Sequence, residues 1–175
     1  MKTKMVASAL AFAAFFNAHA ADHAPLLDQG NDVDQMLALQ EDVELANAPV
    51  NSQEKLISYL SANPSSVFFK LPASAQESFK SSLVFTDKGL ASYYYESLTK
   101  YLTTKQIYEL LSLFGAQKTI FFIPGITASN PMEKNIIVSE SPYTPTPRSG
   151  NICIINGSSS QCRPEYGSMC SRACR

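Results

Sequence analysis

The sequence predicts a mainly α-helical protein, in which a small helical domain is followed by a proline-rich linker and a short disulfide-stabilised C-terminal tail. Apolar residues recur at helical spacing between residues 31 and 114, and several of these segments begin with a helix cap. Three prolines fall between Ser139 and Gly150. All four cysteines of the chain follow that stretch.

Residues 1–20 have the three parts of a signal peptide. Lys2 and Lys4 give a positive start, an uncharged apolar run follows from Val6 to Phe16, and a small-x-small pattern ends at Ala20. The run is shorter than the roughly 20 residues that span a bilayer. We therefore expect cleavage after Ala20 and a protein that is secreted or periplasmic. The alternative is that this segment forms a buried N-terminal helix.

An acidic helical segment, residues 21–51, is expected to follow. Eight acidic residues and one basic residue, Lys55, lie between Ala21 and Asn63. A helix is expected over residues 31–48, with Asn31 or Asp32 as its cap and acidic residues in its first turn. Six side chains of this helix recur at helical spacing: Val33, Met36, Leu37, Gln40, Val43 and Ala46.

Residues 52–138 are expected to form the helical domain. One helix should begin at Ser52 and end before Pro64, and a second should carry Pro72 in its first turn, where proline is tolerated. A third is expected over residues 86–101, because its leucines and tyrosines fall on one side of a helix.

A fourth helix of this domain has the clearest signals. Thr103 and Gln106 form a capping-box pattern, and Gly115 occupies the position of a C-terminal cap glycine. Two short apolar runs follow, "TIFFIPG" and "NIIVSE". Each is interpreted either as a strand or as an apolar segment that packs over the helices.

Residues 139–150 are expected to form an extended, exposed linker, because each proline fixes φ and removes a backbone donor. Exposed linkers are preferred sites of proteolysis. Arg148 offers a trypsin-like cleavage site for a processing protease. A linker that is never cut is an equally good interpretation.

The tail, residues 151–175, contains Cys153, Cys162, Cys170 and Cys174. In an exported protein such a set indicates two disulfides, and the spacing matches none of the paired zinc patterns, so no metal is expected. Three pairings are open. We favour bridges from Cys153 and Cys162 to Cys170 and Cys174, in either order, with the last two on one helical face. The alternative is two local rings.

The sequence offers few groups for catalysis. The only histidine beyond residue 20 is His23, and no nucleophile-elbow, phosphate-loop or dinucleotide-binding pattern occurs. We expect no enzyme activity, no cofactor and no nucleic-acid partner. The tyrosines at 93, 94, 95, 101 and 108 are interpreted as the edge of the core, with a sugar or peptide platform as the less favoured alternative.

The order of parts resembles the secreted bacterial proteins described as bacteriocin fulvocin C-related. The likeness lies in the signal peptide, the helical segment "LTKYLTTKQIYELL" from Leu98 to Leu111, and a short cysteine-containing tail. It implies a secreted protein whose tail carries an antimicrobial activity. The tail is also cationic, since four arginines from Arg148 onward face one acid, Glu165.

Two functions of different class follow from these observations. The first is a secreted precursor of a cationic antimicrobial peptide, in which Arg163, Arg172 and Arg175 bind the anionic membrane or cell wall of target cells. The second is an intact exported helical interaction or binding protein, whose C-terminus is stapled by disulfides.

Overall fold

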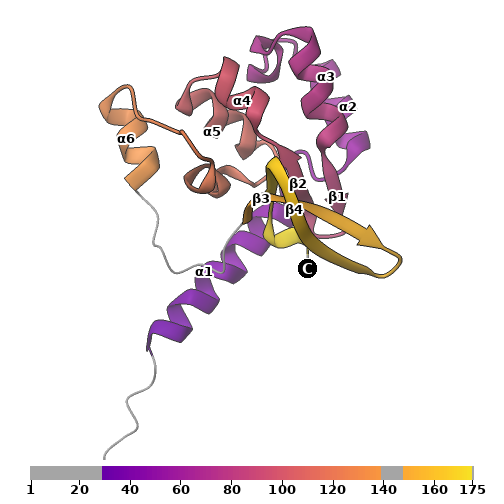
Figure 1. Cartoon of the computed structure of the whole chain (residues 1–175), viewed down its shortest axis with the longest axis vertical. Helices are drawn as coiled ribbons and strands as arrows, with labels where there is room; N and C mark the ends of the chain where they lie inside the picture. The colour runs from indigo at the N-terminus through magenta and orange to yellow at the C-terminus, as the bar shows by residue number, and fades with distance from the viewer. Residues whose placement is uncertain (1–28, 139–147, 175) are drawn as a thin grey trace, which may run out of the picture.

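A computed structural model describes residues 29–138 and 148–174 (Figure 1). Its α-helices are α1 (Gln29–Ala46), α2 (Gln53–Ala62), α3 (Ala73–Ser82), α4 (Glu96–Tyr101), α5 (Thr104–Ser112) and α6 (Pro131–Val138). Its strands are β1 (Val84–Thr86), β2 (Gly89–Tyr94), β3 (Arg148–Asn156) and β4 (Ser159–Cys170). Three short 3-10 helices are η1 (Val67–Lys70), η2 (Gln117–Phe122) and η3 (Arg172–Cys174). The predicted signal peptide, most of the predicted linker and Arg175 lie outside the described residues.

The expectation of a mainly α-helical protein is wrong, because the chain forms a mixed α/β fold. A four-stranded antiparallel sheet has the order β1-β2-β4-β3, so the tail supplies two of its strands. The central pairing joins β2 to β4 and sets Ser92 opposite Cys170. Figure 1 shows β4, in yellow, beside β2 of the preceding domain.

The helix expected over residues 86–101 is replaced by a β-hairpin and the short helix α4. Thr86 pairs with Gly89 across a two-residue turn, and Gly89 has φ 108°, which L-residues rarely adopt. Strand β2 is covered on both faces, since five of its six residues are buried. A strand buried on both faces lacks the alternation of polar and apolar residues, so its apolar run also fits a helical pattern.

The helices capped at Ser52 and Thr103 are confirmed. The Ser52 hydroxyl accepts a hydrogen bond from the backbone N–H of Lys55 at the start of α2, at 3.3 Å. At α5 both capping-box bonds are present, between Thr103 and Gln106, at 3.3 and 3.0 Å.

Helix α1 begins at Gln29, so the predicted caps Asn31 and Asp32 lie inside it, and Pro72 is the N-cap before α3 and not part of its first turn. Of the two apolar runs left open in the sequence, residues 119–122 lie in η2 and residues 135–138 in α6, so these parts are helical rather than extended.

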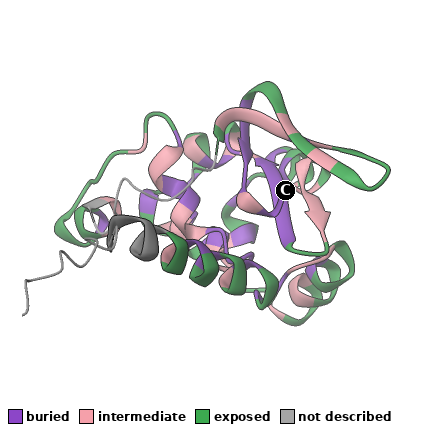
Figure 2. Ribbon diagram, turned by 90° about the horizontal axis from the view of Figure 1, so that it is seen from below, coloured by how far each residue is buried: buried purple, intermediate pink, exposed green. Residues whose placement is uncertain are grey.

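The core is built around aromatic side chains and includes the tail (Figure 2). Phe79 of α3 lies at its centre, with its ring centroid 6.5 Å from that of Phe68, 6.2 Å from Tyr93 and 6.0 Å from Phe114. Five tail residues are buried in the same cluster, namely Cys153, Met169, Cys170, Ala173 and Cys174. The tail therefore contributes to the hydrophobic core of the chain.

The prediction that Cys170 and Cys174 lie on one face of a helix is wrong. Cys170 is the last residue of β4, and Cys174 lies in η3. Side-chain hydroxyls fix this turn to the hairpin: Thr86 donates to the carbonyl of Ala173 at 2.8 Å, and Ser171 donates to that of Leu90 at 2.5 Å. Within residues 29–138 and 148–174, no helix has the length and apolarity needed to cross a membrane.

Candidate functional site

The four tail cysteines form two disulfides, Cys153–Cys174 and Cys162–Cys170, with Cα–Cα distances of 5.7 and 5.9 Å. Each bridge joins an upstream cysteine to one of the last two, which is the pairing favoured from the sequence. The Sγ atoms of Cys153, Cys170 and Cys174 lie within 4.8 Å of one another, but each is already bonded to sulfur and so is not a metal ligand. Two disulfides and no free thiol are typical of a non-reducing environment.

The arginines expected to bind a surface differ in their surroundings. Arg163 is exposed on β4, whereas the side chain of Arg172 is 12% exposed. The Nε atom of Arg172 lies 3.6 Å from a carboxylate oxygen of Glu41 and 3.2 Å from one of Asp42. Arg172 thus ties the tail to α1. Arg148, the predicted processing site, is exposed as the first residue of β3, while Ala20 and Arg175 lie outside the described residues.

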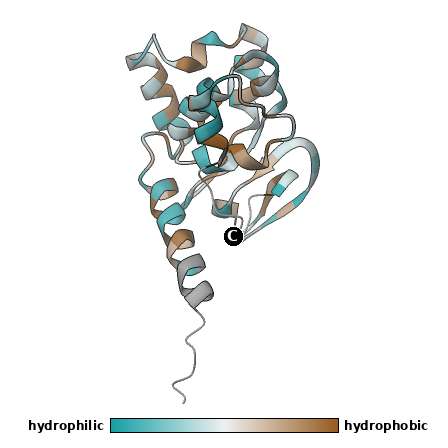
Figure 3. Ribbon diagram, turned by 90° about the vertical axis from the view of Figure 1, so that its left-hand side faces the viewer, coloured by the Kyte–Doolittle hydropathy of each residue, from teal (hydrophilic) through white to brown (hydrophobic). Residues whose placement is uncertain are grey.

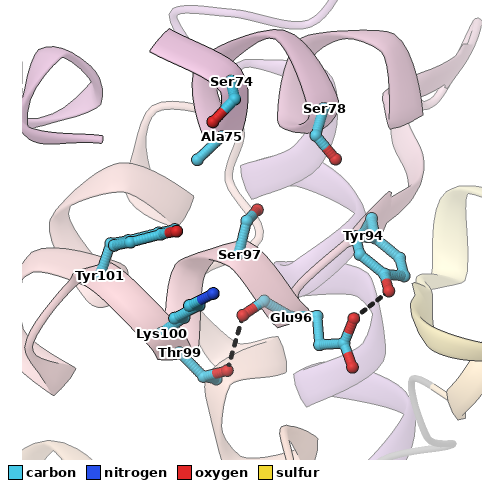
Figure 4. Close-up of a pocket in the computed structure, with 9 residues that line it drawn as sticks. All are labelled: Ser74, Ala75, Ser78, Tyr94, Glu96, Ser97, Thr99, Lys100 and Tyr101. Carbon is cyan, nitrogen blue, oxygen red and sulfur yellow. Dashed lines mark hydrogen bonds between the residues drawn. The ribbon is translucent and has the colours of Figure 1, made fainter. Parts of the chain in front are cut away.

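A polar cleft of about 550 Å³ opens between α3 and α4 (Figure 4). We call it the α3–α4 cleft. This volume lies in the range of sites that bind small molecules. Most of its lining side chains carry a hydroxyl group, and the whole set is Ser74, Ala75, Ser78, Tyr94, Glu96, Ser97, Thr99, Lys100 and Tyr101.

One wall of the cleft contains a tyrosine–carboxylate pair. Tyr94, at the end of β2, donates a hydrogen bond from its hydroxyl to Oε2 of Glu96, the first residue of α4. This hydrogen bond, with smaller contributions from burial and nearby carboxylates, raises the pKa of Tyr94 to about 12. Tyr94 therefore keeps its proton at neutral pH, and it holds the Glu96 carboxylate in one orientation.

Helix α4 also brings a hydroxyl without a partner and an aromatic ring to the cleft. Figure 4 shows Ser97 pointing from α4 toward Ala75 and Ser78 of α3. Its hydroxyl oxygen is buried and has no hydrogen-bond partner within the described part of the chain. Leaving such a group without a hydrogen bond costs roughly 1–3 kcal/mol of stability. Near the mouth, Lys100 lies over the Tyr101 ring, with its Nζ atom 5.3 Å from the centroid.

The tail supports this cleft from behind. Tyr94 pairs with Ser168 across β2 and β4, and the backbone N–H of Tyr95 donates to the carbonyl of Gly167 at 2.8 Å. A Cβ atom at Gly167 would lie 2.8 Å from Cζ of Tyr94, so only a glycine lets this backbone approach the ring. The tail therefore fixes the position of Tyr94, and Tyr94 in turn orients Glu96.

The tyrosine cluster of the sequence is divided between core and cleft. Tyr93 and Tyr95 are buried, as the favoured interpretation required, whereas Tyr94 and Tyr101 line the α3–α4 cleft. Tyr93, Tyr94 and Tyr95 are identical in the sequence, so no pattern there distinguishes the ring that faces the cleft from the two that are buried. The serines of α3 and α4 give no signal either, since exposed serines are common.

Comparisons with protein-family models, with curated proteins and with solved structures found no match for this chain.

Proposed function

We propose that this chain is an exported protein, secreted or periplasmic, which acts intact as a binding protein and takes a neutral sugar in its α3–α4 cleft. The observation that carries the proposal is the packing of the tail backbone, at Gly167, against the ring of Tyr94. Through this contact the disulfide-bonded tail supports the cleft. The tail then serves the binding site of the intact protein.

The chemistry of the cleft supports a sugar as the ligand class. A sugar offers hydroxyl groups that donate and accept hydrogen bonds, together with C–H faces that pack on aromatic rings. The cleft provides an oriented carboxylate at Glu96, an ammonium group at Lys100 and the ring of Tyr101. Its nine lining residues include a single carboxylate, Glu96, whereas glycoside hydrolysis canonically uses a pair, so we propose binding without a covalent step.

The burial of the tail supports action as an intact protein. Release of residues 148–175 would remove two of the four strands and leave the edge of β2 that pairs with β4 without its partner strand. It would also expose Met169 and Cys174, both of which have no measurable solvent contact. The antimicrobial precursor, its target surface, its processing protease and the resemblance to bacteriocin fulvocin C-related proteins all stay predictions. The following experiment tests the first of them, the precursor.

Cutting the chain between Val138 and Arg148 is expected to leave the two fragments together. Both disulfides lie within residues 148–175, so only non-covalent contacts would hold that fragment in place. A recognition sequence for a specific protease would be inserted into this segment of the oxidised protein. After cleavage, gel filtration should give one peak containing both fragments, and the same sample in urea should give two. Spontaneous separation in native buffer would instead favour the precursor.

Sugar binding is expected to depend on Tyr101 and Tyr94. The probes would be maltose, cellobiose and N,N′-diacetylchitobiose, titrated by NMR and calorimetry. Tyr101→Ala should weaken binding by about 1 kcal/mol, roughly fivefold, and Tyr94→Phe should also weaken it, because Glu96 loses the donor that orients it. Phe69→Ala is the matched control, since Phe69 is 43% exposed, close to the 42% of Tyr101, and lies outside the cleft. If none of the three sugars changed the NMR chemical shifts of cleft residues, the proposal of a sugar ligand would be overturned.

A further inference from the structure

Helix α1 carries apolar residues on two opposite faces. Its inner face packs on the body of the protein through four buried residues, Ala38, Glu41, Leu45 and Ala48, the last just beyond the helix. On the other side, Met36 and Leu39 are each 66% exposed and Val43 is 58% exposed. A helix that is apolar on both faces is normally covered on both faces. The outer face therefore lacks a partner within the described part of the chain.

The outer residues follow the spacing of a helix-pairing seam. Met36, Leu39, Val43 and Ala46 are separated by steps of three, four and three residues, the a/d spacing with which helices pack side by side. The sequence places Met36, Val43 and Ala46 in the apolar stripe that would conventionally be assigned to the core. In Figure 3, α1 projects from the rest of the protein with hydrophobic residues along it.

A shallow groove of about 430 Å³ runs beside this seam. Its apolar wall consists of Leu39, Val43 and Ala46 of α1. Charged groups of both signs complete the lining, with Asp42 and Asp87 as acids and Lys88 and Arg172 as bases. The rim is therefore balanced in formal charge.

We propose that the outer face of α1 pairs with the same face of a second copy of this chain, in a two-fold symmetric dimer. In such an interface each patch meets itself, so the patch must be self-complementary. The apolar side chains of the seam make the patch self-complementary, because they can pack against the same side chains of the second copy. The rim of the groove carries two acids and two bases, so the rims of two copies can meet without net repulsion.

The charge of α1 disfavours a lipid surface as the occupant of this face. The helix contains five acidic residues, Asp32, Asp34, Glu41, Asp42 and Glu44, and no lysine or arginine. Helices that lie on anionic membranes carry basic residues on their polar face. A second copy meets no such conflict, because Glu41 and Asp42 are already paired with Arg172 of their own chain.

The dimer is expected to be reversible and dependent on concentration. Stable dimers bury about 800 Å² on each partner, and a seam of four positions covers only part of that, so the groove and the turn at Asp87–Lys88 must also contribute. The inference is independent of the proposed sugar ligand. It would give the protein two α3–α4 clefts in one particle.

Sedimentation equilibrium of the full oxidised chain, over about a hundredfold range of concentration, tests the dimer. With increasing concentration, the apparent molecular mass of the wild type should rise from that of the monomer toward twice that value. Leu39→Glu and Val43→Glu should raise the dissociation constant at least about tenfold, because each places a charge in the seam. Both sites are exposed in the monomer, so the fold should be retained, which circular dichroism checks.

Ile57→Glu is the matched control for these variants. Ile57 lies on α2, is 61% exposed and would receive the same charge outside the seam. It should dimerise like the wild type. A wild type that stays monomeric at the highest concentration would overturn the proposal. The same conclusion would follow if Leu39→Glu and Val43→Glu dimerised as well as the control.

Discussion

Replacing Cys153 and Cys174 together with alanine is expected to destabilise the protein by about 3–5 kcal/mol, the upper part of the range for a native disulfide. The bridge closes a loop with a sequence separation of 21 residues, and both of its cysteines are buried in the shared core. The loss has two sources: the unfolded chain gains freedom, and two sulfur atoms leave space in the core. Differential scanning calorimetry should show the midpoint of unfolding lower by roughly 10–15 °C.

The second disulfide provides the comparison. Replacing Cys162 and Cys170 with alanine should cost less, because Cys162 is only half-buried and the loop has a sequence separation of 8. The difference in loop length alone accounts for less than about 1 kcal/mol between the two losses in the free energy of unfolding. A larger difference would therefore indicate a contribution from the core packing of Cys153 and Cys174. Equal losses would contradict the role assigned to that packing.

Loss of the Cys153–Cys174 bridge should also change the geometry of the α3–α4 cleft. The bridge joins β3 to η3, while β4 contacts Tyr94 through Ser168 and Gly167. If the tail were less firmly held, the Tyr94 ring could move, and the Glu96 carboxylate would no longer be held in one orientation. The stability of the tail and the geometry of the α3–α4 cleft are therefore linked through β2.

The parts of the fold that local chemistry determines could be predicted from the sequence. The caps at Ser52 and Thr103 act within three residues of themselves, and both make the expected hydrogen bonds. The sheet depends on distant residues instead. Ser92 finds its partner at Cys170, and no pattern around β2 alone indicates that a tail strand will cover it.

Helix α1 shows a different limit of sequence reasoning. Its existence was predicted correctly, but a periodic apolar pattern does not say which face the protein buries. Leu45 and Ala38 pack inward, whereas Met36 and Val43 face outward. The inner face also carries Glu41, whose buried carboxylate pairs with Arg172 from the far end of the chain, and no local pattern indicates this contact. The serines of the α3–α4 cleft were missed for the same reason, since their meeting depends on how α3 packs on α4.

Gly115→Ala should test how closely α1 approaches the body of the protein, and we expect a loss of about 3–5 kcal/mol. Gly115 has φ 68°, which costs a residue with a Cβ atom about 1–2 kcal/mol. In addition, the new Cβ would lie 2.6 Å from the carbonyl carbon of Glu44 and 2.9 Å from Cα of Leu45. These are backbone atoms of α1, so the helix itself would have to move.

Gly157→Ala separates the two contributions. Gly157 has φ 60° at the tip of the β3–β4 hairpin, and a Cβ atom there would meet nothing within 4 Å. Gly157→Ala should therefore lower the free energy of unfolding only by the cost of a positive φ for a residue with a Cβ atom, about 1–2 kcal/mol. Urea unfolding of both variants gives the difference, which measures the contact between α1 and the end of α5. If the two losses were equal, α1 would not be held against Gly115, and the outward orientation of Met36, Leu39 and Val43 would lose its structural basis.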